Sequence, residues 1–225
     1  MSTINSESSQ DFRIRPVSDA DFPEVARLYK ACFPESFLAR TGTSMLRRYI
    51  RWLSSRERNR PCTLVAEDSG GLVGYLSAGC YTENVQVSFM KEHRFRLAFA
   101  ILLRPRVAFH PDFMLKIRRA WIGLRRYGAD ASEPRPEEAS AAIASRWSPF
   151  RFHILSVAVL PRGRRRGIGS ALLSKGEIEA RSRDCTFMDA MVKASNDKSL
   201  GLFTRFGFEA VDPDSNSVQV KYEIG

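Results

Sequence analysis

The segment from Ser156 to Leu173 constrains the fold of this chain more than any other. It begins with an apolar run that suits a buried strand, and Pro161 ends that run. Four arginines and three glycines then lead into a helical pattern. A strand that leads into a helix through a short turn is typical of α/β folds. Unpaired N–H groups at the helix start, together with arginines, favour phosphate binding. An ordinary turn with solvated arginines is the alternative for this segment taken alone.

The other elements alternate in type along the chain. Apolar residues at two-residue spacing predict strands, and those at three- and four-residue spacing predict helices. The expected strands are 12–16, 63–67, 72–78, 154–160, 186–192, 208–211 and 218–224. The expected helices follow Ser18 or Asp19, begin near Ser44, and lie at 168–178 and 200–206. This order predicts an α/β fold with a mixed central sheet flanked by helices.

Residues 81–149 differ in composition from the segments around them. Ten basic and two acidic residues lie between 91 and 126, so this stretch carries +8 of the formal net charge of +10. Two basic helices are expected at about 85–103 and 113–127, followed by a linker that two prolines interrupt. We predict a disordered N-terminus at 1–11 and one domain at 12–225, interrupted by a basic helical insertion and linker at 81–149.

The sequence also excludes several classes of protein. Its four cysteines are scattered without metal-ligand spacing, so we expect no structural metal site and only reduced thiols. The N-terminus lacks a signal-peptide pattern, and the longest strongly apolar stretch, 97–103, is too short to span a bilayer. We therefore expect a cytoplasmic protein, and a homodimer is compatible with the sequence.

Three separated motifs resemble those of the GNAT superfamily of N-acetyltransferases. Residues 164–169 are similar to its acyl-CoA-binding signature, Q/R-x-x-G-x-G/A. Residues 196–208 resemble its later motif, which ends in Gly-Phe, and residues 14–21 resemble its first strand and helix cap. The resemblance covers about 12–78 and 150–224. It implies the GNAT-like acyl-CoA N-acyltransferase fold, with a helical insertion before the cofactor-binding strand.

The resemblance implies acetyl-CoA as co-substrate and no metal. The pyrophosphate would lie on N–H groups of the arginine-rich turn, and the pantetheine arm would pair with the strand before it. A backbone N–H near Val159 would polarise the thioester carbonyl. Asn196 matches a cofactor-contacting asparagine of the family, and a plain helix N-cap is compatible with that role. The implied cofactor-binding residues are Val157, Ala158, Val159, Arg164, Arg165, Arg166, Gly167, Ile168, Gly169, Ser170, Asn196 and Phe203.

His153 is the candidate catalytic base. It lies six residues before the last valine of the cofactor strand, where many family members carry a base. With an unperturbed pKa of about 6.5, a histidine can accept a proton at neutral pH; a structural histidine is the alternative. Phe203 stands where the family usually carries a tyrosine acid. The thiolate would therefore leave unaided or with a proton from Tyr222 or Ser156, or else the protein binds CoA without efficient catalysis.

The resemblance implies an acetyl-CoA-dependent N-acetyltransferase acting on a primary amine. Residues 32–42 and the insertion resemble a subgroup found among polysaccharide and aminosugar biosynthesis proteins. This favours a small acceptor such as an aminosugar or a nucleotide-linked aminosugar. A protein or peptide amine acetyltransferase and a non-catalytic CoA-binding module are the alternatives.

Three interpretations of the cationic insertion are open. It could be a solvated lid, or a patch for an anionic acceptor or for peripheral contact with the anionic inner membrane surface. Contact with nucleic acid is the third, and no nucleic-acid motif supports it.

Overall fold

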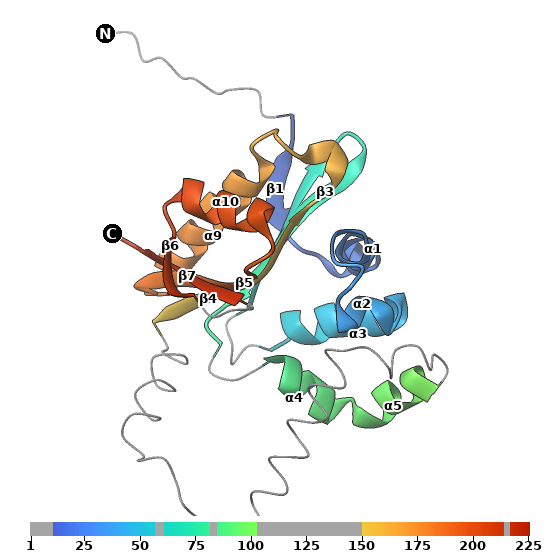
Figure 1. Ribbon diagram of the computed structural model, residues 1–225. Coiled ribbons are helices and arrows are strands. Elements are labelled where there is room, and N and C mark those ends of the chain that lie inside the picture. Colours follow the sequence, from blue (N-terminus) through green and yellow to red (C-terminus); the bar gives the residue numbers. More distant parts are fainter. Residues whose placement is uncertain (1–10, 57–60, 82–84, 103–149, 214–216) are drawn as a thin grey trace, which may run out of the picture.

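The computed structural model describes residues 11–56, 61–81, 85–102, 150–213 and 217–225, and a single seven-stranded sheet lies at its centre (Figure 1). The strand order is β1-β2-β3-β4-β5-β7-β6. All neighbouring strands are antiparallel except β4 and β5, which are parallel. The strands are β1 (Arg13–Pro16), β2 (Pro61–Asp68), β3 (Gly71–Gly79), β4 (Arg151–Val159), β5 (Phe187–Lys193), β6 (Glu209–Pro213) and β7 (Ser217–Glu223).

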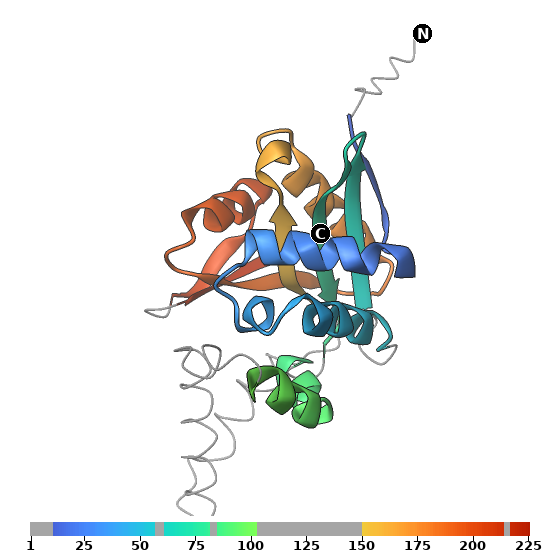
Figure 2. The same ribbon diagram turned by 90° about the vertical axis from the view of Figure 1, so that its right-hand side faces the viewer.

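Helices cover both faces of the sheet. Figures 1 and 2 show α1 and α3 on one face, with α9 and α10 on the other and α4 and α5 beyond α3. The helices are α1 (Phe22–Cys32), α2 (Phe37–Arg40), α3 (Thr43–Ser54), α4 (Val85–Glu92), α5 (Arg94–Leu102), α9 (Ile168–Arg181) and α10 (Asp197–Phe206), with 3-10 turns η1 (Asp19–Asp21) and η3 (Pro161–Gly163). None of these helices is long and apolar enough to cross a bilayer.

The connection from β1 to α1 is held by Asp21. Arg15 donates two hydrogen bonds to its carboxylate, at 2.6 and 2.9 Å, and the backbone N–H and hydroxyl of Ser18 each donate one at 2.7 Å. The guanidinium and Ser18 lower the pKa of Asp21, although burial opposes them. Pro23, which fits the first turn of a helix, then starts α1.

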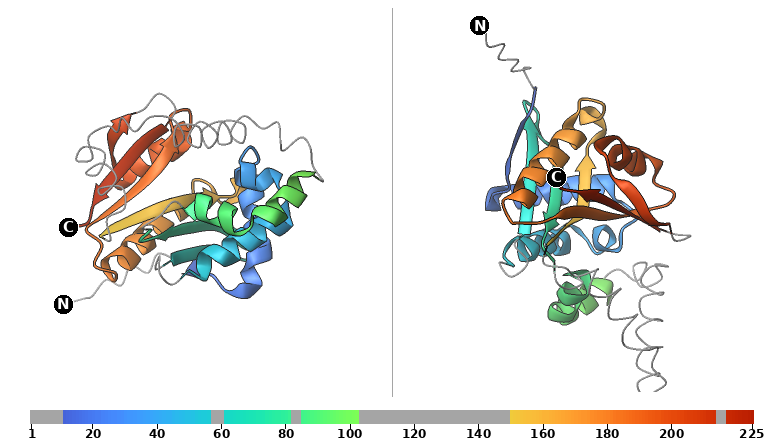
Figure 3. Two further views of the ribbon diagram at one scale, coloured as in Figure 1. Left: turned by 90° about the horizontal axis from the view of Figure 1, so that it is seen from below. Right: turned by 90° about the vertical axis from the view of Figure 1, so that its left-hand side faces the viewer.

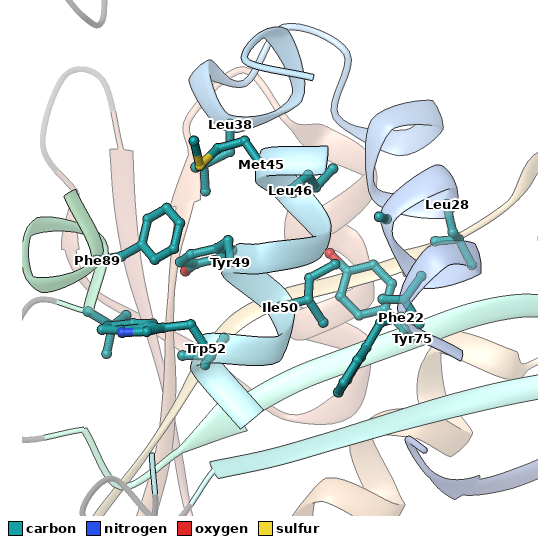
Figure 4. Close-up of a cluster of buried hydrophobic side chains, with 14 of the residues drawn as sticks. Phe22, Leu28, Leu38, Met45, Leu46, Tyr49, Ile50, Trp52, Tyr75 and Phe89 are labelled. Carbon is teal, nitrogen blue, oxygen red and sulfur yellow. The ribbon is translucent and has the colours of Figure 1, made fainter. Parts of the chain in front are cut away.

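Two apolar cores, one on each face of the sheet, stabilise this arrangement. The α1-side core contains Leu46, Tyr49 and Phe89, and Figure 4 shows these side chains between α1, α3 and α4. The α9-side core joins Leu172 and Phe203 to the opposite face of the same strands. Burying apolar surface on both faces explains why β2 and β3 are apolar with little alternation.

The sequence prediction of a mixed central sheet flanked by helices is confirmed, but some boundaries differ. The expected helix at 85–103 is two helices that meet at His93. The helix α2 was not predicted, because four residues are too few to show a helical period. The expected helix at 113–127, the linker after it and the N-terminal ten residues lie outside the described residues.

Gly163 offers a test of packing between η3 and β3. A Cβ at this buried position would lie 2.3 Å from Val73 Cγ2, so Gly163→Ala should lower the free energy of unfolding by about 1–3 kcal/mol. Gly201, inside α10, is the matched control, since its Cβ would meet only Arg205 Nη1, at 3.7 Å. Gly201→Ala should stabilise by up to about 1 kcal/mol through helix propensity. Urea unfolding measures both, and equal midpoints for the two variants would contradict this account.

Candidate functional site

The two parallel strands at the centre of the sheet separate after a short pairing. The register runs only from Arg151 opposite Phe187 to Ile154 opposite Ala190. Beyond it the strands diverge (Figure 3), so within the described chain residues 155–159 of β4 have no strand partner on this side. A free strand edge inside a sheet can pair with an extended ligand as an added strand does.

A β-bulge in β4 decides which side chains face the α1 side of this opening. Ser156 lies opposite Ser77, but the next β3 residue, Ala78, lies opposite Ile154, so Leu155 is an extra residue. The bulge brings His153 and Ser156 to the same face although three positions separate them. His153 packs edge-on against Tyr81, at 6.4 Å between ring centroids, and Ser156 Oγ accepts a 3.0 Å hydrogen bond from the Tyr75 hydroxyl.

The turn from β4 to α9 presents backbone N–H groups. Arg165 and Gly167 both have positive φ, 62° and 78°, and α9 begins at the next residue. Nothing lies within 4 Å of a Cβ built on Gly167, so its backbone conformation explains the glycine. In the described residues, no backbone acceptor is recorded for the N–H groups of residues 165–170. Such a cluster at a helix N-terminus is suited to an anion.

Three of the four arginines of the turn bind other parts of the protein. Arg162 and Arg166 both donate to Asp68, at 2.6 and 2.8 Å, and hold the β2–β3 turn against the start of α9. These two arginines, Arg162 first, lower the pKa of Asp68 to about 2. Arg164 Nε instead donates to the Val159 carbonyl, at 3.2 Å. Part of the cationic charge of the turn is therefore balanced by the hairpin, and phosphate contact by Arg164 and Arg166 stays a prediction.

A buried polar cluster lies where β4 and β5 begin to separate. Arg151 donates to both carboxylate oxygens of Asp189, and Gln219 donates to the same carboxylate at 3.1 Å. His153 Nδ1 lies 2.9 Å from Asp189 Oδ1 and 2.8 Å from Arg151 Nη2. Asp189 is fully buried, which alone would raise its pKa, but hydrogen bonds from His153 and Arg151 outweigh burial and lower it.

The tautomer of His153 depends on whether its Nδ1 donates a hydrogen bond to Asp189 or accepts one from Arg151. In the neutral ring, Nδ1 can donate to Asp189 or accept from Arg151, but it cannot do both. Donation to Asp189 leaves Nε2 with its lone pair and therefore able to accept a proton. Donation to Asp189 is therefore the arrangement in which His153 could act as a base, and acceptance from Arg151 is the arrangement in which it could not.

The other predicted cofactor residues are distributed over this opening and the core behind it. Val157 and Val159 pack on the α9-side core and Ala158 on the α1-side core. Asn196 caps α10, where its side chain accepts from the Ser199 N–H at 3.2 Å. A Cβ on Gly169 would lie 3.2 Å from Leu202 methyls, so this glycine lets α9 and α10 approach each other. Ile168 is buried, and Ser170 is exposed at the helix start.

The structure separates the two residues suggested as alternative proton donors. Phe203, which lacks a hydroxyl, is 2% exposed and packs 4.9 Å from the Phe208 ring. Tyr222 packs on the α9 side with Phe206 and donates to Glu177 at 3.3 Å. Ser156 faces the opposite side, which it shares with His153. The contact of Phe203 with a cofactor stays a prediction.

Sequence reasoning missed Arg151, Asp189 and Tyr75. The signal for the first two was present, because an arginine and an aspartate interrupt two otherwise apolar strand patterns, and buried charges are seldom unpaired. Their pairing could not be read from the sequence, since it depends on the parallel register of β4 and β5. Tyr75 gave no signal, because an aromatic residue in an apolar strand is ordinary core.

A cavity of about 340 Å³ lies on the α1 side of the sheet. It is lined by α1, α2 and the connection between them, by α3 and α4, and by the last residue of β5. Its lining residues are Tyr29, Cys32, Phe33, Pro34, Glu35, Ser36, Phe37, Leu38, Tyr49, Gln86, Phe89, Met90 and Lys193. None of them was a predicted site residue.

The cysteines take no part in the opening between the strands. Cys62, Cys80 and Cys185 are buried in the α9-side core, and Cys32 is half-buried beside the cavity. Among the described residues, no group of three or more His, Cys, Asp or Glu side chains is placed to hold a metal ion.

The sequence matches a model of the acetyltransferase (GNAT) family over residues 22–208. No curated protein matches the chain. The match spans most of the sequence and includes β4, the arginine-rich turn and α10. The chain therefore belongs to the GNAT family of acetyltransferases, and the fold predicted from the three motifs is confirmed.

Solved structures agree on the fold. The chain is 17% identical to yncA, a putative acetyltransferase from Salmonella typhimurium solved with acetyl-CoA, with a TM-score of 0.57 and coverage of 96% and 95% of the two chains. It is 20% identical to the ribosomal-protein-alanine N-acetyltransferase of Brucella melitensis, with a TM-score of 0.53 and coverage of 94% and 99%. It is 12% identical to the PaiA N-acetyltransferase of Thermoplasma acidophilum, solved with coenzyme A, with a TM-score of 0.51 and coverage of 94% and 98%.

Asp189→Asn should destabilise the protein strongly at neutral pH. It leaves the buried Arg151 without its counter-charge, which costs about 3–5 kcal/mol. Because folding lowers the pKa of Asp189, its stabilisation is present above the unfolded value near 3.9 and is lost as pH falls below it. The difference between wild type and variant should therefore shrink toward pH 3.

Urea unfolding at several pH values measures this difference. Glu223→Gln is the matched control, since its ion pair with Lys221 is largely exposed and should contribute less than about 1 kcal/mol. If the difference in the free energy of unfolding between wild type and Asp189→Asn stays constant from pH 7 to pH 3, the ionised carboxylate of Asp189 is not what stabilises the protein.

Proposed function

We propose that this acetyltransferase moves an acetyl group from acetyl-CoA to the primary amine of a small molecule. The observation that carries the proposal is that an unpaired strand edge and a cluster of backbone N–H groups follow one another directly along the chain. The unpaired edge of β4 at 155–159 leads into the N–H groups of residues 165–170. An extended arm followed by a pyrophosphate fits this order, because the arm needs strand-like partners and the phosphates need N–H donors. Acetyl-CoA and coenzyme A in two similar structures support the same choice.

His153 is the proposed base. An acceptor amine must lose a proton before its nitrogen can attack the thioester carbonyl, and Nε2 of His153 is the group that would accept it. The Asp189 carboxylate holds the ring by Nδ1, at 2.9 Å, and so favours the tautomer with a free Nε2. Asp189 is a positioning residue in this account, since it acts through His153.

The acceptor is proposed at two levels. N-acetyl transfer requires an amine nitrogen that carries a proton, and the sequence resemblance favours the primary amine of an aminosugar or a nucleotide-linked aminosugar. Acetylation of a protein or peptide amine is the alternative acceptor class. A CoA-binding module without turnover is the remaining alternative, and Phe203 in place of a tyrosine is the feature that favours it.

Contact between the basic insertion and an anionic membrane surface or acceptor, and the cytoplasmic location, stay predictions. The described part of the insertion offers some support. In α5, Phe95 and Phe99 are 76% and 62% exposed, and Arg94 lies over the Phe95 ring at 4.8 Å. Exposed aromatic rings beside a cation are typical of helices that lie on lipid or on a partner.

A thiol-release assay with a panel of amines tests the proposed reaction. Release of CoA thiol from acetyl-CoA should require an amine, and acetyl-pantetheine, which lacks the pyrophosphate, should be at least about 100-fold poorer in kcat/KM because it forgoes the N–H cradle. The panel should contain small amines, aminosugars and peptides. Acetyl-CoA binding without thiol release for any acceptor would leave only the binding module.

His153→Ala should lower kcat by about 100-fold or more, the usual effect of losing a general base. The fall in wild-type activity on the acid side of the pH profile should disappear in the variant, because no imidazole remains to be protonated. KM for acetyl-CoA should change little, since His153 lies before the free edge of β4. A variant that keeps the acid limb of the wild type would contradict the assignment.

A further inference from the structure

The cavity lies on the α1 side of the sheet, the side that His153 and Ser156 also face. Tyr29, on its wall, lies 6.3 Å from the Tyr75 ring, and the Tyr75 hydroxyl donates to Ser156 in the unpaired part of β4. At another point the wall includes Lys193, the last residue of β5. The cavity therefore touches the end of β5, and its wall is linked to the unpaired part of β4 through Tyr75. A molecule in it would then lie on the side of the sheet from which an arm paired with β4 could be reached.

The buried part of the wall is apolar and rich in aromatic rings. Phe37, Leu38 and Phe89 are 6%, 7% and 0% exposed, and the rings of Tyr49 and Phe89 meet edge-on at 5.0 Å (Figure 4). Such a wall provides flat apolar contact and very few hydrogen bonds. A ring-shaped apolar group would bury its faces there without leaving polar atoms unpaired.

The charged lining residues belong to the exposed part of the cavity. Glu35 and Lys193 are both exposed, and the Glu35 carboxylate is ion-paired with Arg40. The hydroxyl of Ser36 accepts the Ala39 N–H in the cap of α2. Burial raises the pKa of Tyr29, and a hydrogen bond with Ser36 partly opposes that shift. These polar groups therefore have partners already, or lie toward solvent.

Tyr49 supplies the polar group of the buried wall. The residue is 5% exposed, and no hydrogen bond of its hydroxyl is recorded in the parts of the chain that the structure describes. Burial raises its pKa, so the hydroxyl keeps its proton and can donate. A hydroxyl on the wall of a cavity, with no described protein group bound to it, is suited to a polar atom of a ligand.

We propose that this cavity is the acceptor site and that it takes a primary amine carried on a flat apolar ring with one polar substituent, which Tyr49 binds. The inference rests on the proposed N-acetylation and narrows it. A pyranose ring in the same place would set several hydroxyls against apolar rings, and unpaired buried hydroxyls weaken binding. The structure thus favours an arylalkylamine over the aminosugar suggested by the sequence.

Four amines of similar size test this choice in the thiol-release assay: tyramine, phenethylamine, glucosamine and 1,4-diaminobutane. The two aryl amines should exceed the other two in kcat/KM by about 10-fold or more, as expected for filling an apolar pocket. Tyr49→Phe should raise KM for tyramine about 10-fold and change KM for phenethylamine less than about 2-fold. A higher kcat/KM for glucosamine or the diamine, or an equal effect of Tyr49→Phe on both aryl amines, would overturn the proposal.

A binding measurement separates this inference from the proposed reaction. 4-Ethylphenol has the ring and hydroxyl of tyramine but no amine, so calorimetric titration reports on the cavity even if no amine is acetylated. Wild type should bind it about 10-fold more tightly than Tyr49→Phe, whereas the matched Tyr222→Phe, on the opposite face of the sheet, should bind it like wild type. If wild type does not bind 4-ethylphenol, the cavity assignment is refuted while the proposed acetyl transfer is unaffected. A changed affinity of Tyr49→Phe for acetyl-CoA would also refute the assignment, because Tyr49 would then not belong to the acceptor site alone.

Discussion

The buried ion pair between Arg151 and Asp189 joins β4 and β5 where the two strands have their only shared register. It fixes the point from which the strands diverge, and everything proposed for the site depends on that divergence. The same carboxylate holds His153, so the contact that links the strands also orients the candidate base. A buried ion pair is seldom the most stabilising choice for a core, but breaking one is costly, which suits a group that must stay in place.

Most of the fold could be predicted from the sequence because its elements carry local signals. The proline after β4, the arginine-rich turn and the alternation in β7 each indicate their structure within a few residues. The site was predictable only in part. His153 and the turn follow from a local motif. Asp189, in contrast, reaches His153, which is 36 positions away, through the register of two strands, and the cavity is assembled from five separate elements.

The arginine-rich turn shows that the number of charged residues in a segment does not by itself predict a cationic binding site. Four arginines in five positions suggest a strong cationic site, yet Asp68 takes hydrogen bonds from two of them. The groups of the turn that are suited to an anion also include the backbone N–H groups of residues 165–170, which a count of charged residues does not reveal. Two residues with positive φ, Arg165 and Gly167, shape this part of the turn.

The extra residue at Leu155 separates β4 into two parts that face the molecule independently. Before the bulge, alternate side chains form the polar cluster with β5; after it, alternate side chains line the free edge. A one-residue insertion or deletion in one part need not move the side chains of the other part to the opposite face of the sheet, because the bulge can accommodate the change in register. The half of this strand that carries His153 and the half that leads to the arginine-rich turn can therefore vary separately, so that one half of the sheet can keep its geometry while the residues beside it change.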